Sequence, residues 1–522
     1  MLPVVAPQAL TMILEAELAG ANKGWTDLSA DVNLGASPIS LDYGIRGGGP
    51  TNRVAAVGTL SFVLKNSERS SGGVNGYYTP GHVNARSGWD LGVAIRLRIG
   101  YGGLWYYKFR GTLISIDPDA GLYRRRSVTC VAHDWLDEAL NSYVRDTEVQ
   151  LNKRSDQIVA TLVQNSSRRQ PTATDYKQGQ STFAYALDNV RDEKTSLMRA
   201  LADVAYSEIG YLYMKGDNLQ GGTLCFEDRH HRPKAVPLAT FNDDMFELDV
   251  LRSRSDILNH VNTVVHPRQV DAAATTVLYQ LTTTETVPEI PAGGTLPMTV
   301  FFKDATGRFV RVGATDVVTP VPGTDYIANT QADGGGSVIT GDLSLSFSAS
   351  SNTGTISLTN NGSQTAYLTT LQVRGKAIAD RFELSVFKHN EASEEAYGEH
   401  DITYDVAYEG SPIYALGVCD WFLSLYGDPR MVISAIRLKS NKSAAMMLQS
   451  LAREPGDKIT ITESMTGISG VDYVINGCRL TIKKGSLIEC SWVLAPADQQ
   501  EAWLLEDAVA GLLEDTSVLG FV

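Results

Sequence analysis

Two neighbouring histidines are the first residues in this sequence whose types could do chemistry. His230 and His231 follow Glu227 and Asp228, and together the four have the side chains of a metal site. Adjacent residues of a strand point to opposite faces, so two neighbouring histidines seldom share one ion. The sequence therefore predicts plain surface positions for them and no metal ligands.

Other acidic positions raise the question of catalysis. His133-Asp134 stands where a helix is expected to begin, and Asp117-Pro118-Asp119 has the composition of a turn. A glycosidase needs only two carboxylates about 5–10 Å apart, and the 59 acidic residues of the chain leave such a pair open with nothing in its favour. The sequence has no GxSxG elbow, P-loop, HExxH motif or EF-hand loop. We therefore expect no enzyme, no catalytic residue, no cofactor and no metal.

Aromatic residues form a third kind of candidate site. Tyr77 and Tyr78 stand in an expected loop, and Trp105, Tyr106 and Tyr107 stand in an expected strand. Tyr and Trp are favoured at interfaces, so these positions could bind a sugar or a partner protein. Strand alternation places Trp105 and Tyr107 on one face and Tyr106 on the other, so part of the set is expected in the core.

Length and composition bound the class of protein. A chain of 522 residues is too long for one core, so three or four domains are expected. The formal net charge of -14 disfavours a protein that grips nucleic acid through its phosphates. The five cysteines form no CxxC pair, which suits folding in a reducing cytoplasm. A charged secretory start and an apolar membrane span are both missing from the sequence.

The stretch from Trp89 to Trp135 is the clearest β-structure. Residues Val93–Ile99 alternate between apolar and polar side chains, Leu104–Ile116 returns after a Gly-rich turn, and Ser127–Ala132 follows Asp117–Gly121. This order predicts a meander within a small closed or half-closed barrel.

Helices and strands alternate in the next part of the chain. Ser196–Ile209 has one apolar face, a capping residue at its start and Gly210 at its end, which predicts a helix. Tyr211–Met214 and Thr223–Phe226 are expected to form a hairpin after it. Short strands within Phe241–Leu251 and Asn262–His266 are expected to return toward the first barrel.

Composition changes near Ala272. Residues Val277–Val373 contain no Cys, Trp or His and alternate Leu, Ile and Phe with Ser and Thr, which predicts an inserted β-sandwich. After it, Ser411-Pro412 begins a second capped helix that ends at Gly427-Asp428-Pro429. Further strands are expected between Met431 and Leu494.

Several stretches resemble the tail-hub (minor tail, baseplate hub-like) proteins of tailed bacteriophages and prophages. They are Phe62–Arg69, Gly76–His82, the strand that begins at Gly92-Val93, Phe109-Arg110-Gly111, Asn259–Val264, Leu371–Gly375, Trp503–Leu505 and Thr516–Gly520. These are packing and turn motifs, loose one by one but spread over most of the chain.

The resemblance implies a mainly β fold with α+β parts, in which two barrels per subunit are similar to tail-tube folds. The expected units are residues 1–141 as a first hub barrel closed by strands near 258–271, 142–257 as an α+β domain, 272–375 as the inserted sandwich, 376–495 as a second barrel with helix 411–427, and 496–522 as a C-terminal tail without room for a lytic domain.

The resemblance also implies a function and partners. A homotrimer of such chains would offer pseudo-sixfold symmetry to a hexameric ring at the virion tail tip, after assembly in the host cytoplasm. Its partners would be a distal tail ring, the tape-measure protein and a fibre or receptor-binding protein, with DNA passing through unbound. Two alternatives stay open: a receptor- or carbohydrate-binding tip protein, testable at Tyr326 or Tyr367, which are expected to be exposed on the sandwich, and a cell-wall hydrolase.

Overall fold

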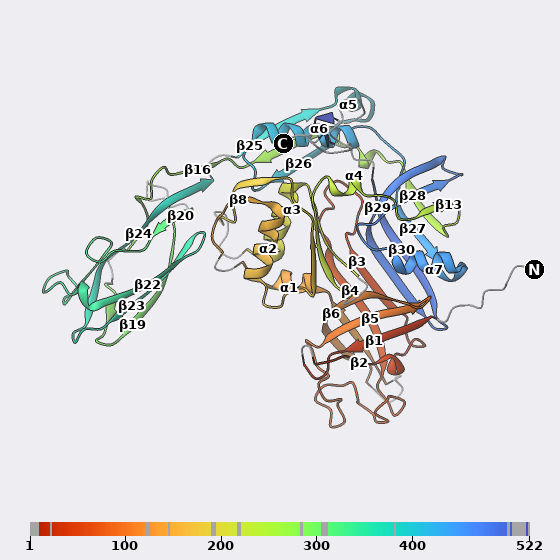
Figure 1. The fold of residues 1–522 in the computed structure, drawn as a ribbon, viewed down its shortest axis with the longest axis horizontal. Coiled ribbons are helices and arrows are strands. Elements are labelled where there is room, and N and C mark those ends of the chain that lie inside the picture. The colour runs from red at the N-terminus through yellow and green to blue at the C-terminus, as the bar shows by residue number, and fades with distance from the viewer. Residues whose placement is uncertain are drawn as a thin grey trace, which may run out of the picture.

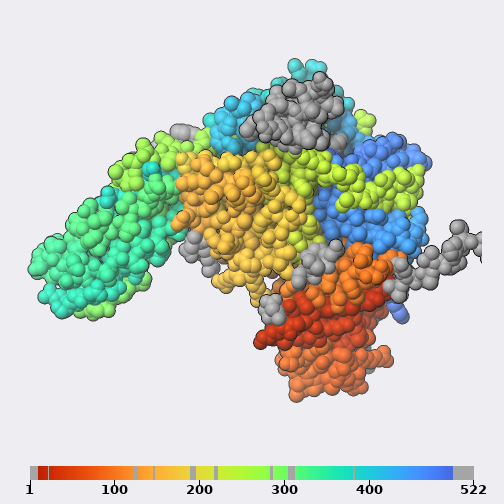
Figure 2. Space-filling model, in the orientation of Figure 1, coloured from red at the N-terminus to blue at the C-terminus, as the bar shows by residue number. Residues whose placement is uncertain are grey.

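The computed structural model describes residues 10–20, 23–120, 126–144, 147–188, 195–216, 221–281, 286–303, 312–380 and 383–497, together with the backbone of 502–503 and 518–519. Its elements are mostly strands, in several sheets, with a few short helices. The prediction of a mainly β fold is confirmed. Figure 1 shows a broad body and a narrow arm, and Figure 2 shows that the arm projects from one side of it.

The first lobe of the body is a six-stranded curled sheet with strand order β3-β4-β7-β6-β5-β1, and the short β2 pairs with β1. The predicted meander is present as β5, β6 and β7. The stretch from Leu28 to Asn33 links β1 to β4, since Leu28 N–H donates to Leu14 and Asn33 N–H donates to Val63. The strand bounds are β1 Thr11–Ala16, β2 Thr26–Asp27, β3 Ile39–Gly44, β4 Ala56–Lys65, β5 Ala94–Tyr101, β6 Leu104–Pro118 and β7 Ser127–His133.

The second lobe is also six-stranded, with order β13-β28-β29-β30-β27-β14. Its outermost strands, β13 and β14, are joined by residues 243–246 alone, so this sheet also curls back on itself. The helix α7 (Ala444–Ala452) packs beside it, with Ser443 as N-cap. The strand bounds are β13 Thr240–Asn242, β14 Glu247–Leu251, β27 Val432–Lys439, β28 Lys458–Glu463, β29 Ile468–Lys483 and β30 Leu487–Pro496.

The two lobes form one continuous sheet because β3 pairs with β29 over Ile39–Gly44 and Gly477–Ile482. The backbones approach closely there. A methyl group on Gly44, whose φ is +95°, would lie 2.5 Å from the carbonyl oxygen of Asn476. Only glycine fits such a position without strain.

Two sequence expectations are wrong about which strands pair with these lobes. β15 (His260–Val265) pairs with β25 (Leu384–His389) and β26 (Asp401–Val406), so the strands near 258–271 do not close the first barrel. β13 and β14, expected to return toward the first barrel, pair with β28 and β27 of the second lobe. Period-2 alternation predicts that a strand exists but not which partner it finds.

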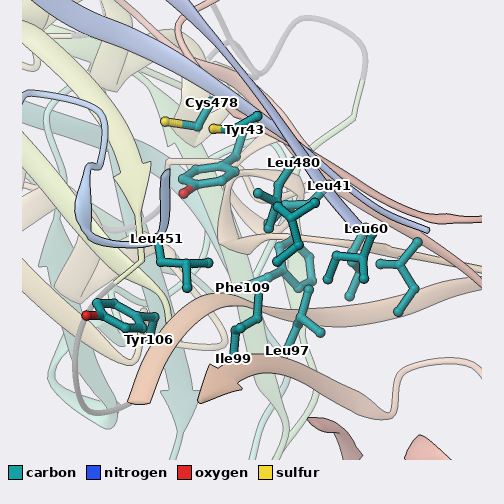
Figure 3. Close-up of a cluster of buried hydrophobic side chains, with 14 of the residues drawn as sticks. Leu41, Tyr43, Leu60, Leu97, Ile99, Tyr106, Phe109, Leu451, Cys478 and Leu480 are labelled. Atoms are coloured by element: carbon teal, nitrogen blue, oxygen red, sulfur yellow. The ribbon is translucent and has the colours of Figure 1, made fainter. Parts of the chain in front are cut away.

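A single apolar core runs through both lobes. Figure 3 shows Leu451 of α7 beside Tyr106 and Phe109 of the first lobe. It also shows Tyr43 of β3 next to Cys478 of β29, across the seam at which these two strands join the lobes. All of these side chains are buried. The lobes therefore share their hydrophobic stabilisation and do not form separate cores.

An α+β unit packs against the seam. The predicted helix is α3 (Leu197–Glu208), with Ser196 accepting from the Arg199 N–H at its start and Ile209 in the left-handed region at its end. The predicted hairpin is β11–β12. The remaining elements are α1 Trp135–Asn141, β8 Gln150–Arg154, α2 Ser155–Ser166, β9 Ala173–Tyr176, β10 Thr182–Ala186, β11 Tyr211–Lys215, β12 Thr223–Glu227 and α4 His231–Lys234.

A small separate unit holds the second predicted helix. α6 (Pro412–Tyr426), capped by Ser411, covers one face of the three-stranded sheet β25-β15-β26 through Tyr414, Val418 and Phe422. The short α5 spans Glu391–Tyr397. This corrects the expected second barrel at 376–495, because β25 and β26 belong to a different sheet from β27–β30 and α6 covers that other sheet.

The arm contains two facing sheets around an apolar core, as expected for an inserted sandwich. Strand β24 (Ala366–Asp380) pairs with β16, β17, β18, β20 and β21, and the second sheet has the order β19-β23-β22. The other bounds are β16 Arg268–Val270, β17 Thr276–Gln280, β18 Glu289–Ile290, β19 Thr295–Phe301, β20 Gly313–Val318, β21 Tyr326–Asn329, β22 Leu343–Ala349 and β23 Thr353–Asn360. The pairing of β16 with β24 thus extends the unit beyond 272–375.

The C-terminal stretch is described only in part. β31 (Ala502–Trp503) and β32 (Val518–Leu519) pair in parallel, and the rest of 498–522, including most of the two C-terminal motifs, lies outside the described residues. In the described part of the chain, no helix is both long and apolar enough to cross a membrane.

Candidate functional site: a polar junction and an aromatic face

A buried lysine lies where the first lobe, the second lobe and the α+β unit meet. Lys108 is the extra residue of a β-bulge, since Leu97 pairs with Phe109 and Arg98 pairs with Tyr107. A bulge redirects a side chain out of the regular alternation. The Lys108 side chain therefore leaves the strand pattern and is only 3% exposed.

The Lys108 ammonium is fully occupied by groups of the second lobe. Its Nζ donates to the carbonyl oxygens of Leu451 at 3.1 Å and Arg453 at 3.3 Å, and to the Glu454 carboxylate. Burial alone would lower the pKa of Lys108, but the Glu454 carboxylate outweighs it and the pKa is raised. The lysine is thus held as a cation inside the body.

The other oxygen of Glu454 completes the junction. It accepts from Tyr43 Oη of β3 at 2.7 Å and from the Gly216 N–H, beyond β11, at 2.9 Å. Burial, and then the Glu454 charge, raise the pKa of the Tyr43 phenol well above its ordinary value. One carboxylate thereby connects three units that are far apart in the sequence. Removing any of its partners would leave a buried charge without compensation and destabilise the fold.

A second network repeats the arrangement. Arg232 Nε lies 2.7 Å from Glu227 Oε2, and Tyr213 Oη donates to Glu227 Oε1 at 2.7 Å. Arg232 Nη1 also donates to the side chain of Asn476, the bulge residue of β29, at 2.7 Å. Asn476 Nδ2 then donates to Gly47 at 2.6 Å, so this network again joins all three units.

The histidines considered as metal ligands lie beside this second network. His231 Nε2 is 3.9 Å from Glu227 Oε1, and the Glu227 carboxylate already has its arginine and tyrosine partners. His230 follows Asp228, whose carboxylate accepts the His230 backbone N–H at 2.7 Å. No group of three or more His, Cys, Asp or Glu side chains able to hold a metal occurs among the described residues.

The remaining acidic candidates have local partners. Asp134 caps α1 by accepting the Leu136 N–H at 3.0 Å. His133 Nδ1 lies 3.1 Å from Asp137 Oδ1. Asp117 and Asp119 lie at the end of β6 and just beyond it.

The aromatic candidates divide between core and surface. Tyr78 and Tyr106 are buried, and Tyr78 anchors the loop before β5, with its Oη donating to Asp31 and accepting from Arg86. Trp105 is 37% exposed, and Tyr107 is half-buried on the outer face of β6. In the sandwich, Tyr326 is 3% exposed, so its expected exposure is wrong because it points into the arm's core, whereas Tyr367 is half-buried.

Arginines interleave with the surface aromatics of the first lobe. The Arg98 guanidinium lies 4.4 Å from the Trp105 ring centroid, and that of Arg96 lies 4.2 Å from the Trp25 ring centroid. Glu15 anchors both arginines, with its carboxylate oxygens 2.7 Å from Arg96 Nη2 and 2.9 Å from Arg98 Nη2. This aromatic face has the Trp, Tyr and Arg composition of protein interfaces.

Sequence reasoning missed the polar junction. Lys108 and Glu454 are 346 residues apart, and neither stands in a motif. The local signal is a charged residue between two aromatic residues of a strand, Lys108 between Tyr107 and Phe109.

Comparison with known proteins gave structural matches only. No family model matches the chain, and no curated protein sequence does. Among solved structures, it is similar to a tail protein from Neisseria meningitidis MC58, with 8% identity, a TM-score of 0.46 and coverage of 93% of this chain and 96% of that one. The 43 kDa tail protein of prophage MuSo2 from Shewanella oneidensis gives 8% identity, a TM-score of 0.46 and coverage of 94% and 99%.

A third similar structure comes from a secretion system. The E. coli c3393 protein, described as a component of the type VI secretion system with structural similarity to the T4 bacteriophage tail proteins gp27 and gp5, matches with 8% identity, a TM-score of 0.35 and coverage of 94% of this chain and 76% of that one. Two tail proteins, one of them from a prophage, thus stand among the solved structures similar to this chain.

Proposed function

We propose that this chain is a structural virion protein, the hub at the distal end of a phage tail. In this role it joins the tail tube and distal tail ring to the tip or fibre and forms part of the channel for DNA ejection. The observation that carries the proposal is the pair of six-stranded lobes joined into one sheet by β3 and β29.

Two lobes per chain suit a symmetry adapter. A closed ring of three chains would present six β lobes, and six lobes can meet six subunits of a neighbouring ring one to one. The proposed assembly is therefore a homotrimer. Its subunit has to hold both lobes at a fixed angle, which is what the shared core and the Lys108–Glu454 contact provide.

The proposed partners follow from this position. A distal tail ring lies above the hub, the tape-measure protein inside it, and a fibre or receptor-binding protein below it. The face around Trp25, Trp105 and Tyr107 is the candidate contact for one of these proteins. The net charge of -14 suits a conduit whose wall does not retain passing phosphates. The protein would be assembled in the host cytoplasm and reside at the virion tail tip.

We assign no catalytic role. Three strongly buried ion pairs of the body make structural contacts: Lys108 with Glu454, Arg232 with Glu227, and Arg229 with Glu208. One of the two tyrosines expected to bind a receptor or sugar on the arm, Tyr326, lies in the core and is not accessible to a ligand.

Negative-stain electron microscopy tests the proposal. The purified chain is imaged alone and after addition of the neighbouring tail-ring protein, with a Trp105→Ala variant and an Arg374→Ala variant of the arm as a matched control. We expect threefold particles with a central opening that stack on the ring, with stacking weakened by the Trp105 change and unaffected by the arm change. Compact monomers on every grid would contradict the hub.

A further inference from the structure

A cleft of about 1070 Å³ separates the first lobe from the α+β unit. Its lining includes two arginines, Arg110 and Arg169, and a larger number of carboxylates. The carboxylates are those of Glu17, Asp90, Asp134, Asp137 and Glu138. Arg110 Nη2 lies 3.7 Å from Glu17, and His133 lies 3.1 Å from Asp137, which leaves the cleft acidic on balance.

Asp134 adds an observation independent of the charge count. The side chain lines the cleft and is 5% exposed, and its Oδ1 caps α1 while its Oδ2 has no hydrogen-bond partner among the described residues. A buried acceptor without a donor is costly, so this carboxylate favours a cation held close to it in the cleft. Burial raises the pKa of Asp134 to about 7, as expected for a carboxylate that lacks such a donor.

A group of lysines lies at the tip of the second lobe. Lys439 ends β27, Lys442 ends the 3-10 turn at Ser440–Lys442, and Lys483 and Lys484 stand at the β29–β30 turn. Asn441 holds the two turns together, donating to the carbonyl of Ser486 at 3.1 Å and accepting the Ile488 N–H at 2.7 Å. Lys483 pairs with Glu489. Lys439, Lys442 and Lys484 are exposed, although the Lys442 ammonium donates to the Asp244 carbonyl oxygen at 3.0 Å and the Lys439 ammonium lies 3.6 Å from the Phe246 ring centroid. We call this group the lysine tip.

The cleft and the lysine tip lie on opposite sides of the body. Figure 1 shows α1, which lines the cleft, on the side of the first lobe that faces the arm, and α7, which follows the lysine tip, on the other side. Two complementary patches on opposite sides make a head-to-tail contact, and such contacts close into rings when the rotation permits.

We propose that the acidic cleft receives the lysine tip of a second copy of this chain. This inference rests on the proposed ring and identifies the surfaces that close it. The Lys484 and Lys442 ammonium groups supply N–H donors to the carboxylates of α1, and each chain gives its tip to one neighbour while its cleft accepts the tip of the other. The contact is electrostatic, so it weakens as salt rises.

Charge reversal tests the contact. One variant carries Lys439→Glu, Lys442→Glu and Lys484→Glu, a second carries Asp137→Lys and Glu138→Lys, and a third combines all five changes. Light scattering after size-exclusion chromatography gives the assembly mass at several protein concentrations. The control carries Lys153→Glu and Asp333→Lys, two exposed residues that belong neither to the cleft lining nor to the lysine tip.

We expect each reversal alone to weaken association by roughly tenfold or more, because like charges then face each other. The combined variant is expected to regain association, since a negative tip again meets a positive cleft, and the control to match the wild type. In the wild type, a zero-length carbodiimide cross-linker should join Lys442 or Lys484 to Asp137 or Glu138 of another copy. Tryptophan fluorescence first establishes that each variant is folded.

Two results would overturn the inference and separate it from the proposed function. Rings of wild-type mass in both single reversals, with cross-links mapping elsewhere, would reject this contact while leaving the hub proposal standing. Monomeric wild type at every concentration would reject the ring itself and with it the contact.

Discussion

The body and the arm are held together in different ways. In the body, ion pairs with both partners largely buried lie where separate units meet. Lys108–Glu454 joins the two lobes directly, and Arg232–Glu227 joins the α+β unit to β29 through Asn476. In the arm, the core is apolar, and the pairs Asp325–Arg374 and Lys376–Asp316 each reach solvent through at least one partner. The body uses charge where it joins distant segments, and the arm relies on neighbouring strands.

This difference follows from chain topology. The body joins β3 to β29, which are separated by most of the sequence, whereas the arm is one contiguous stretch that leaves and re-enters through the adjacent strands β16 and β24. Hydrophobic burial is not directional, so a fixed angle between lobes needs contacts with geometry. The arm has to form only its own core, whereas the body also has to hold its two lobes at one angle.

The largest expected effect comes from breaking the junction. Lys108→Met leaves the Glu454 carboxylate buried without its cation, and we expect the free energy of unfolding of the body to fall by about 3–5 kcal/mol. Residues 268–380 contain no tryptophan, so tryptophan fluorescence during urea unfolding reports the body alone. The double variant Lys108→Met/Glu454→Leu should recover much of the loss. An equal loss from Arg374→Met, measured by hydrogen exchange of arm peptides, would remove the distinction between the two regions.

A second effect concerns pH. The pKa of Asp134 is raised from 3.8 to about 7 by burial, so the folded body holds this proton more tightly than the unfolded chain does. The stabilisation is complete below the ordinary value and is lost as pH rises from about 4 to 7, by up to about 4 kcal/mol. Asp134→Asn, which keeps a capping oxygen, should flatten urea midpoints measured at pH 4.5, 6 and 8.

The arm gives the control of opposite sign. Hydrogen bonds from Arg374, the Val321 backbone and Gln372 outweigh the effect of burial and lower the pKa of Asp325. Its contribution is present at neutral pH and is lost as pH falls through the folded pKa. The hydrogen-exchange protection of arm peptides, corrected for the intrinsic exchange rate at each pH, should therefore fall in acid, and identical pH trends of stability in both regions would contradict the assignment.

Glycine substitutions at the seam and in the arm should differ in their loss of unfolding free energy, by less than the effects above. Gly44→Ala combines a positive φ with a methyl group 2.5 Å from Asn476, and we expect a loss of about 3 kcal/mol. Gly323→Ala in the arm has a φ of +77° but open space around it, so about 1 kcal/mol is expected. Urea unfolding by fluorescence measures the first, and hydrogen exchange of arm peptides the second. Equal losses would show that close approach at the seam does not matter.

Removing the arm should change the body least. β16 and β24 pair antiparallel, and the Asp271 N–H donates to Ala377 at 3.0 Å, so an Asn-Gly turn can replace residues 272–376. We expect the free energy of unfolding of the body, measured by urea unfolding, to stay within about 0.5 kcal/mol of the wild type. A large loss would mean that the arm supports the body and that the two regions are not independent.

The sequence predicted elements whose signals are local. The helix after Ser196, the helix after Ser411 and the meander of β5–β7 each depend on caps, turns or alternation within a short stretch, and all are present. The partner of β15 was predicted wrongly, because the alternation of side chains along a strand does not indicate which strand pairs with it. The predicted exposure of Tyr326 was wrong for a similar reason, since a shift of one residue in strand register moves a side chain from one face of the sheet to the other.

The junction could not be predicted in this way. Lys108 and Tyr43 of the junction, and Asn476 of the second network, stand at β-bulges or irregular pairings, and a bulge breaks the period by which inward residues are recognised. A charged residue between two aromatic ones is a usable signal of such a site, although it does not identify the carboxylate that lies across the seam.

The continuity of the two lobes is most directly tested by native-state hydrogen exchange resolved by peptide in low urea. We predict that β4 and β7 of the first lobe and β29 and β30 of the second open with one shared free energy, and that β23 and β24 of the arm open with a different one. Lobes that open independently of each other would contradict the single two-lobed sheet on which the hub proposal stands.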